Sequence, residues 1–151
     1  MVRLPALIDK TQLALNWDAT DASGEVTAFD VQVKVGETGA WTDWLVNVNN
    51  KTASYQGQDG MRYAFRCRAK DAAGNVEDYP ENEMVAVSID IAPPTPVAQI
   101  KAVPLAGGDI ELKWSPAEDR VSGLNFYRVY RWIEGQQPKL ISIAGEVKEI
   151  S

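Results

Sequence analysis

The chain has 151 residues, of which 45% are hydrophobic and 24% charged, and its formal net charge is −6. This composition is typical of a globular protein with one domain or two small ones. The acidic balance argues against nucleic-acid binding, which depends on basic patches. No apolar run approaches the roughly 20 residues of a transmembrane helix, so we expect no membrane span. The absence of His and the single Cys remove the commonest general base and any internal disulfide.

Seven segments within residues 1–91 have the two-residue alternation of β-strands, and we find no helical hydrophobic period there. The clearest is 60–75, where Tyr63, Phe65 and Cys67 alternate with polar or small residues. We expect this segment to contain a central strand. The other expected strands lie within 2–8, 11–17, 29–35, 41–48, 51–56 and 84–91. Short strands separated by turns are typical of an all-β sandwich.

Residues 92–96 read Ala-Pro-Pro-Thr-Pro and predict an extended linker, because Pro cannot donate to a sheet. After them the pattern restarts: a strand ends in Trp114 as an earlier one ends in Trp17, and the offset between copies is 97 to 99 residues. We therefore predict domains at 1–91 and 97–151. The second copy has further strand candidates at 126–130 and 140–143, but no counterpart of 60–75 or 84–91. We expect it to be incomplete and the chain to be a fragment of a longer tandem array.

These motifs resemble the fibronectin type III superfamily. The resemblance rests on the strand Leu13–Trp17, the aromatic Phe29 on the next strand, and the run Tyr63–Ala69 after a Gly. An immunoglobulin domain would place its core Trp on the third strand and would usually pair a second Cys with Cys67. The phrases within 41–45 and 68–77 are similar to fibronectin-like repeats of large prokaryotic secreted or cell-surface proteins. The resemblance implies tandem, immunoglobulin-like β-sandwiches in an extracellular or cell-surface protein, with the second sandwich incomplete.

Several residues are expected to have structural roles. Trp17 and Trp114 lie on apolar strand faces and are assigned to the core. The hydroxyl of Tyr63 should bond backbone near 58–59, in a tyrosine corner. Cys67 is interpreted as a small buried hydrophobe. Two basic residues of the same strand, Arg66 and Arg68, are expected to pair with Asp30 on the adjacent strand.

Three aromatic residues, Trp41, Trp44 and Tyr55, are the candidates for ligand binding. Trp41 and Trp44 are three residues apart, so a regular strand would point them to opposite faces. An exposed ring could stack on a sugar, whereas the alternative is that one ring caps the edge of the sandwich and the other fills a gap. Trp132 raises the same question in the second copy.

Two acidic loops are the candidates for an ion site. Their residues are Asp18, Asp21 and Glu25 in one loop, and Asp71, Asn75, Glu77 and Asp78 in the other. Such oxygen ligands suit Ca²⁺, but Asp and Asn are also ordinary turn residues, and the spacing matches no known calcium loop. We assign no catalytic, metal or cofactor-binding residue and expect no enzyme.

The leading hypothesis is a non-catalytic spacer or interaction module, including adhesion, in a multidomain extracellular or cell-surface protein. Its partners would be neighbouring domains of the same polypeptide, and polysaccharide or other surface proteins. The alternative is a carbohydrate-binding or accessory module of a secreted carbohydrate-active enzyme. Exposure of Trp41 and Trp44 is the feature that separates the two hypotheses.

Overall fold

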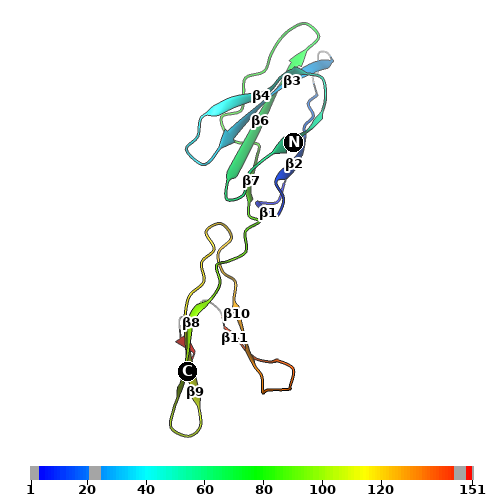
Figure 1. Cartoon of the computed structure of the whole chain (residues 1–151). Helices are drawn as coiled ribbons and strands as arrows, with labels where there is room; N and C mark the ends of the chain where they lie inside the picture. The colour runs from blue at the N-terminus through cyan, green and yellow to red at the C-terminus, as the bar shows by residue number, and fades with distance from the viewer. Residues whose placement is uncertain (1–3, 21–24, 145–148, 151) are drawn as a thin grey trace. The chain divides into compact units, whose positions relative to one another are not determined.

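The computed structural model describes residues 4–20, 25–144 and 149–150, and these form strands and connecting loops without a helix (Figure 1). The chain divides into two compact units, Met1–Ala92 (unit 1) and Pro93–Ser151 (unit 2). Thr95, which the sequence assigned to the linker, exchanges two hydrogen bonds with Glu118 of unit 2, at 2.9 and 2.7 Å. No helix in the described ranges is long and apolar enough to cross a membrane.

Unit 1 is a sandwich of two sheets. The five-stranded sheet has the order β1-β7-β6-β3-β4 and the other sheet pairs β2 with β5. The strands are β1 (Leu7–Ile8), β2 (Gln12–Asn16), β3 (Val26–Val35), β4 (Trp41–Val48), β5 (Thr52–Gln56), β6 (Arg62–Asp71) and β7 (Val85–Ile89). The predicted central strand is confirmed, because β6 lies between β3 and β7 and is antiparallel to both (Figure 1).

The core of unit 1 fills the space between the two sheets. Alternate residues of β2, β3, β6 and β7 are buried, as the period of two predicted. Trp17 is buried, as expected, and packs edge-on against Phe29 at 6.5 Å between ring centroids. Phe65 is fully buried on the central strand. Truncating such an aromatic residue to Ala costs about 3–5 kcal/mol, so these rings dominate the stability of the sandwich.

The predicted tyrosine corner is confirmed. The hydroxyl of Tyr63 accepts a hydrogen bond from the backbone N–H of Gln58 at 2.9 Å. The ring packs closely on Gly57, where an added Cβ would lie 2.9 Å from Tyr63 Cε2 and 2.4 Å from Ile89 Cδ1. A side chain at position 57 would therefore push the corner away from the core.

Unit 2 contains two smaller sheets. One has the order β12-β9-β8 and the other pairs β10 with β11. The strands are β8 (Ala98–Pro104), β9 (Ile110–Ser115), β10 (Tyr127–Arg131), β11 (Lys139–Ala144) and β12 (Glu149–Ile150). β8 and β12 were not among the predicted strands. The assignment of Trp114 to the core was wrong, because Trp114 is only half-buried.

The two units share one local arrangement around these Trp residues. In unit 2, Trp114 packs edge-on against Tyr127 at 5.5 Å and 64°, as Trp17 packs against Phe29 at 64° in unit 1. The hydroxyl of Tyr127 also accepts a hydrogen bond from the N–H of Ala117 at 3.0 Å. The equivalent packing of Trp114 on Tyr127 and of Trp17 on Phe29 aligns Tyr127 with Phe29, and therefore β10 with β3.

Candidate functional site

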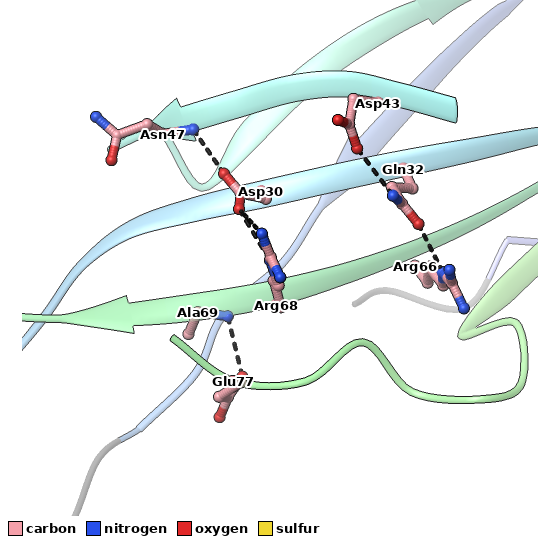
Figure 2. A network of polar contacts seen from close by, with 8 residues as sticks. All are labelled: Asp30, Gln32, Asp43, Asn47, Arg66, Arg68, Ala69 and Glu77. Carbon is pink, nitrogen blue, oxygen red and sulfur yellow. Dashed lines mark hydrogen bonds and ion pairs between the residues drawn. The ribbon is translucent and has the colours of Figure 1, made fainter. Parts of the chain in front are cut away.

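Polar and aromatic side chains gather on the face of the five-stranded sheet that points away from the core. They come from β3, β4, β6 and the segment 72–84 that follows β6, and we call them the outer-face network. Its members are Asp30, Gln32, Lys34, Trp41, Asp43, Arg66, Arg68 and Tyr79. Figure 2 shows how the polar members bridge three neighbouring strands.

Two rows of hydrogen bonds cross the strands in this network (Figure 2). In one row, Asp30 binds Arg68 through Oδ2 at 2.8 and 2.9 Å and accepts the N–H of Asn47 through Oδ1 at 2.8 Å. This confirms the predicted pairing of Arg68 with Asp30. Arg66 was predicted to pair with Asp30 too, which is wrong, since its register partner is Gln32 and it donates to Gln32 Oε1 at 2.9 Å.

The second row continues from Gln32 and includes cation–π contacts. Gln32 donates through Nε2 to Asp43 at 2.8 Å. The guanidinium of Arg66 lies between two rings, 4.4 Å from the centroid of Trp41 and 4.9 Å from that of Tyr79. The guanidinium of Arg68 lies 4.5 Å from the centroid of the Tyr79 ring. Cationic side chains and aromatic rings therefore alternate across the sheet. They stabilise one another through these contacts, with no ligand involved.

The segment 72–84 is fastened to this sheet at several points. Glu77 accepts the N–H of Ala69 at 3.0 Å, and the carbonyl of Pro80 accepts Arg66 Nη1 at 3.0 Å. Glu83 forms ion pairs with Arg62 and with Lys34, the latter at 3.6 Å. Its hydrogen bond with Arg62 holds the pKa of Glu83 below its ordinary value, while burial raises the pKa of Tyr79 in the same segment.

The three predicted ligand-binding aromatics are separated by the sheet. As predicted, Trp41 and Trp44 point to opposite faces. Trp44 packs on the core. Its ring centroid lies 5.2 Å from that of Tyr55, 5.8 Å from that of Phe65 and 6.4 Å from that of Trp17. Tyr55 is part of the same cluster, and burial raises its pKa. Trp41 lies on the outer face, where Arg66 and Lys34 lie over its ring. The structure therefore does not bring these three residues together as one platform.

Three carboxylates of the acidic loops, those of Asp18, Asp71 and Glu77, are bonded to groups of the chain itself. Asp18 pairs with Lys51 at 2.7 Å, and this bond lowers the pKa of Asp18. Asp71 accepts both the backbone and the side-chain N–H of Asn75 at 2.7 Å, which lowers the pKa of Asp71. Asp21 lies outside the described residues. Among the described residues there is no group of three or more His, Cys, Asp or Glu placed to hold a metal ion.

Unit 2 has a second candidate surface, which the sequence did not single out. It is a groove of about 390 Å³, here called the unit 2 groove. Its lining residues are Val97, Ile100, Leu112, Trp114, Tyr127, Arg128, Val129, Tyr130 and Trp132. Trp132 is 67% exposed and Ile100 is 66% exposed. The one signal of it in the sequence was the aromatic residue Trp132, which could either pack or face solvent.

Comparison with known proteins adds little beyond fold class. No family model matches the chain. A similar solved structure is the kinase region of twitchin from C. elegans (Fn31-NL-kin-CRD-Ig26), with 19% identity and a TM-score of 0.45. The match covers 69% of this chain and only 18% of that one. The protein is an all-β sandwich, and a likeness at this level carries no argument about its activity.

Proposed function

We propose that the chain is a non-catalytic structural module of a multidomain protein, a spacer that holds its neighbours apart outside the cell or at the cell surface. The observation that carries this proposal is the outer-face network of unit 1. The charged and aromatic groups described on that face bind one another. Such a face makes a sheet more rigid, and its polar groups are engaged with one another and not available to bind a substrate.

The energetics of the network fit a rigid module. Each cation–π contact or cross-strand ion pair contributes about 0.5–1 kcal/mol when exposed to solvent. Several of them connect β3, β4, β6 and the segment 72–84. β3 and β6 are in addition hydrogen bonded along their length, from Val26–Asp71 to Val35–Tyr63. Separating the two strands requires breaking many bonds together, which favours a unit that resists load until it unfolds at once.

Force spectroscopy on the full chain, held at its two ends, tests the spacer proposal. If unit 1 is a rigid module, its 92 residues should unfold in one discrete event that releases about 300 Å of chain. Phe65→Ala should lower the force of that event, because it removes the most central buried ring. Gradual extension without a discrete event would contradict the proposal.

Carbohydrate binding is the second candidate, and it is supported by the exposed ring of Trp132 in the unit 2 groove. Trp44 and Tyr55 are engaged in the core, and Trp41 is engaged by two cations, so Trp132 is the ring best placed to stack on a sugar. A pull-down with insoluble polysaccharides separates the two functions. Binding that is lost in Trp132→Ala but kept in Trp41→Ala would replace the spacer by a carbohydrate-binding module.

A further inference from the structure

The loop between β4 and β5 of unit 1 carries an acceptor motif for N-linked glycans. Residues 50–52 read Asn-Lys-Thr, and no other Asn in the sequence is followed by Ser or Thr two residues later. All three residues are exposed. Such a short motif often occurs by chance, so its place in the fold decides what it means.

The fold presents the two ends of this motif to solvent. The carbonyl of Lys51, the middle residue, accepts the N–H of Trp17 at 2.9 Å and fastens the loop to the sandwich. Thr52 begins β5, and because the next residue, Ala53, packs on the core, Thr52 lies on the outward side of the strand. Asn50 lies in the loop itself. A glycosyltransferase can therefore reach both the amide of Asn50 and the hydroxyl of Thr52.

The same loop follows an open edge of the five-stranded sheet. β4 is the last strand in the order β1-β7-β6-β3-β4, and no strand among the described residues pairs with its outer edge. Both neighbours of β4 along the chain, β3 and β5, are present in unit 1, so this edge belongs to the sandwich itself. The N–H and C=O groups of an open edge can pair with a strand of another chain and start aggregation.

The sequence of β4 gives this edge little protection. Proteins usually guard an edge strand with Lys, Pro, a bulge or a covering segment. β4 has neither Lys nor Pro, and its one charged residue, Asp43, accepts a hydrogen bond from Gln32. Val46 is 60% exposed. The register with β3 shifts between Asp43 and Val48, which makes the strand irregular but adds no charge. A bulky polar group beside β4 would supply the missing protection.

We propose that Asn50 carries an N-linked glycan that shields the open edge of β4 from other chains. The proposal rests on the proposed location of the protein outside the cell. In the transfer, Nδ2 of Asn50 bonds to C1 of the first sugar of a lipid-diphosphate-linked oligosaccharide. The bond from C1 to the phosphate oxygen breaks, the lipid diphosphate leaves, and Nδ2 loses one proton to a base of the transferase. Asn50 lies two residues after the end of β4 at Val48, so its Cα is within about 7 Å of that end.

The first measurement is the occupancy of position 50 in the full chain, secreted from a eukaryotic cell line behind a cleavable signal sequence. A peptide N-glycosidase, which removes the glycan and converts the modified Asn to Asp, should increase the mobility of the chain on a gel. Mass spectrometry should then locate the conversion at position 50. Asn50→Gln and Thr52→Ala should abolish the shift, whereas Thr52→Ser and the neighbouring Asn49→Gln should retain it. A secreted chain without a glycan at position 50 overturns the proposal. It leaves the spacer function untouched, because force spectroscopy tests that function on the unmodified chain.

The second measurement separates shielding of β4 from a general gain in solubility. The secreted Asn50→Gln chain should aggregate several-fold faster than wild type in light scattering, and adding Val46→Lys should slow it again, because Lys protects an edge. The matched control adds Asp9→Asn to Asn50→Gln, which moves the same Asn-Lys-Thr motif to 9–11, after β1 at the opposite edge of the sheet. A glycan there should not slow aggregation. Equal rescue by the moved glycan, or no effect of Asn50→Gln, overturns the shielding role.

Discussion

Arg68 lies directly opposite Asp30 across the β6–β3 pair, and its Nε and Nη2 lie 2.9 and 2.8 Å from the same carboxylate oxygen. The other oxygen of Asp30 accepts the N–H of Asn47. One carboxylate therefore connects β6, β3 and β4. The hydrogen bond to Asp30 raises the pKa of Arg68 above its ordinary value, so the guanidinium stays charged.

This connection should be measurable as a coupling energy. We expect a double-mutant cycle of Asp30→Ala and Arg68→Ala, measured by urea unfolding, to give a coupling of about 0.5–1 kcal/mol. Asp30→Ala should be the more destabilising single change, since it also leaves Asn47 N–H without its acceptor. The matched control is the pair Asp18–Lys51, whose side chains are more than half exposed, and its coupling should be smaller. Equal couplings for both pairs would refute the structural role of Asp30.

The tyrosine corner predicts a second stability effect. Tyr63→Phe removes the acceptor of the Gln58 N–H and leaves the buried ring in place. We expect a loss of about 0.5–1.5 kcal/mol in the free energy of unfolding of unit 1, the contribution of one hydrogen bond. Tyr130→Phe, at an exposed position of unit 2, is the control and should change little. If the two substitutions have the same small effect, the corner bond does not stabilise the sandwich.

Cys67 should be unreactive in the folded chain. Its side chain is buried, and burial raises the pKa of the thiol above its ordinary value of 9.0. Thiolate, the reactive form, is therefore favoured less in the folded than in the unfolded chain. Cys67 favours the folded state fully below pH 9 and loses this contribution as the pH rises through its folded pKa. Labelling by iodoacetamide at pH 8 should be slow and should become fast in urea. Equally fast labelling without urea would contradict the assignment of Cys67 to the core.

Glu83 gives the stability of unit 1 a pH dependence. Its hydrogen bond with Arg62 lowers its pKa from the ordinary value of 4.5. The contribution of the charged form is therefore present above pH 4.5 and is lost as the pH falls through the lowered pKa. We expect Glu83→Gln to lower the melting temperature at pH 6 and to have less effect as the pH falls through the lowered pKa, because wild type then loses the same ion pairs. An effect of the substitution that does not change with pH would exclude this linkage.

Much of unit 1 could be predicted from the sequence because its strands are amphipathic. Tyr63, Phe65 and Cys67 alternate with polar or small residues, so periodicity alone located β6 and its buried face. The opposite orientations of Trp41 and Trp44 followed from the same period, whereas the hydroxyl bond of Tyr63 followed from the tyrosine-corner motif. β8 was missed because its sequence, Ala-Gln-Ile-Lys-Ala-Val-Pro, has weak alternation and its side chains are exposed throughout.

The outer-face network was harder to predict, because it depends on register and on a loop. Arg66 pairs with Gln32 and not with Asp30, a difference of two residues in β3 that no single-strand pattern encodes. Tyr79 has no periodic signal, yet its ring lies against Arg66 and Arg68. The unit 2 groove likewise depends on β10 having no second neighbouring strand in the described structure. The amino-acid composition cannot predict such a missing neighbour.

Native-state hydrogen exchange on the full chain most directly tests the central claim, that unit 1 is a closed rigid sandwich while β10 of unit 2 keeps an open edge. The account predicts that amides of β3 and β6 exchange only through global unfolding of unit 1. It also predicts that the amides of β10 that point away from β11 exchange far faster, because no strand among the described residues covers them. Equal, strong protection of β10 and β3 in the isolated chain would contradict the account, as would rapid exchange throughout β6.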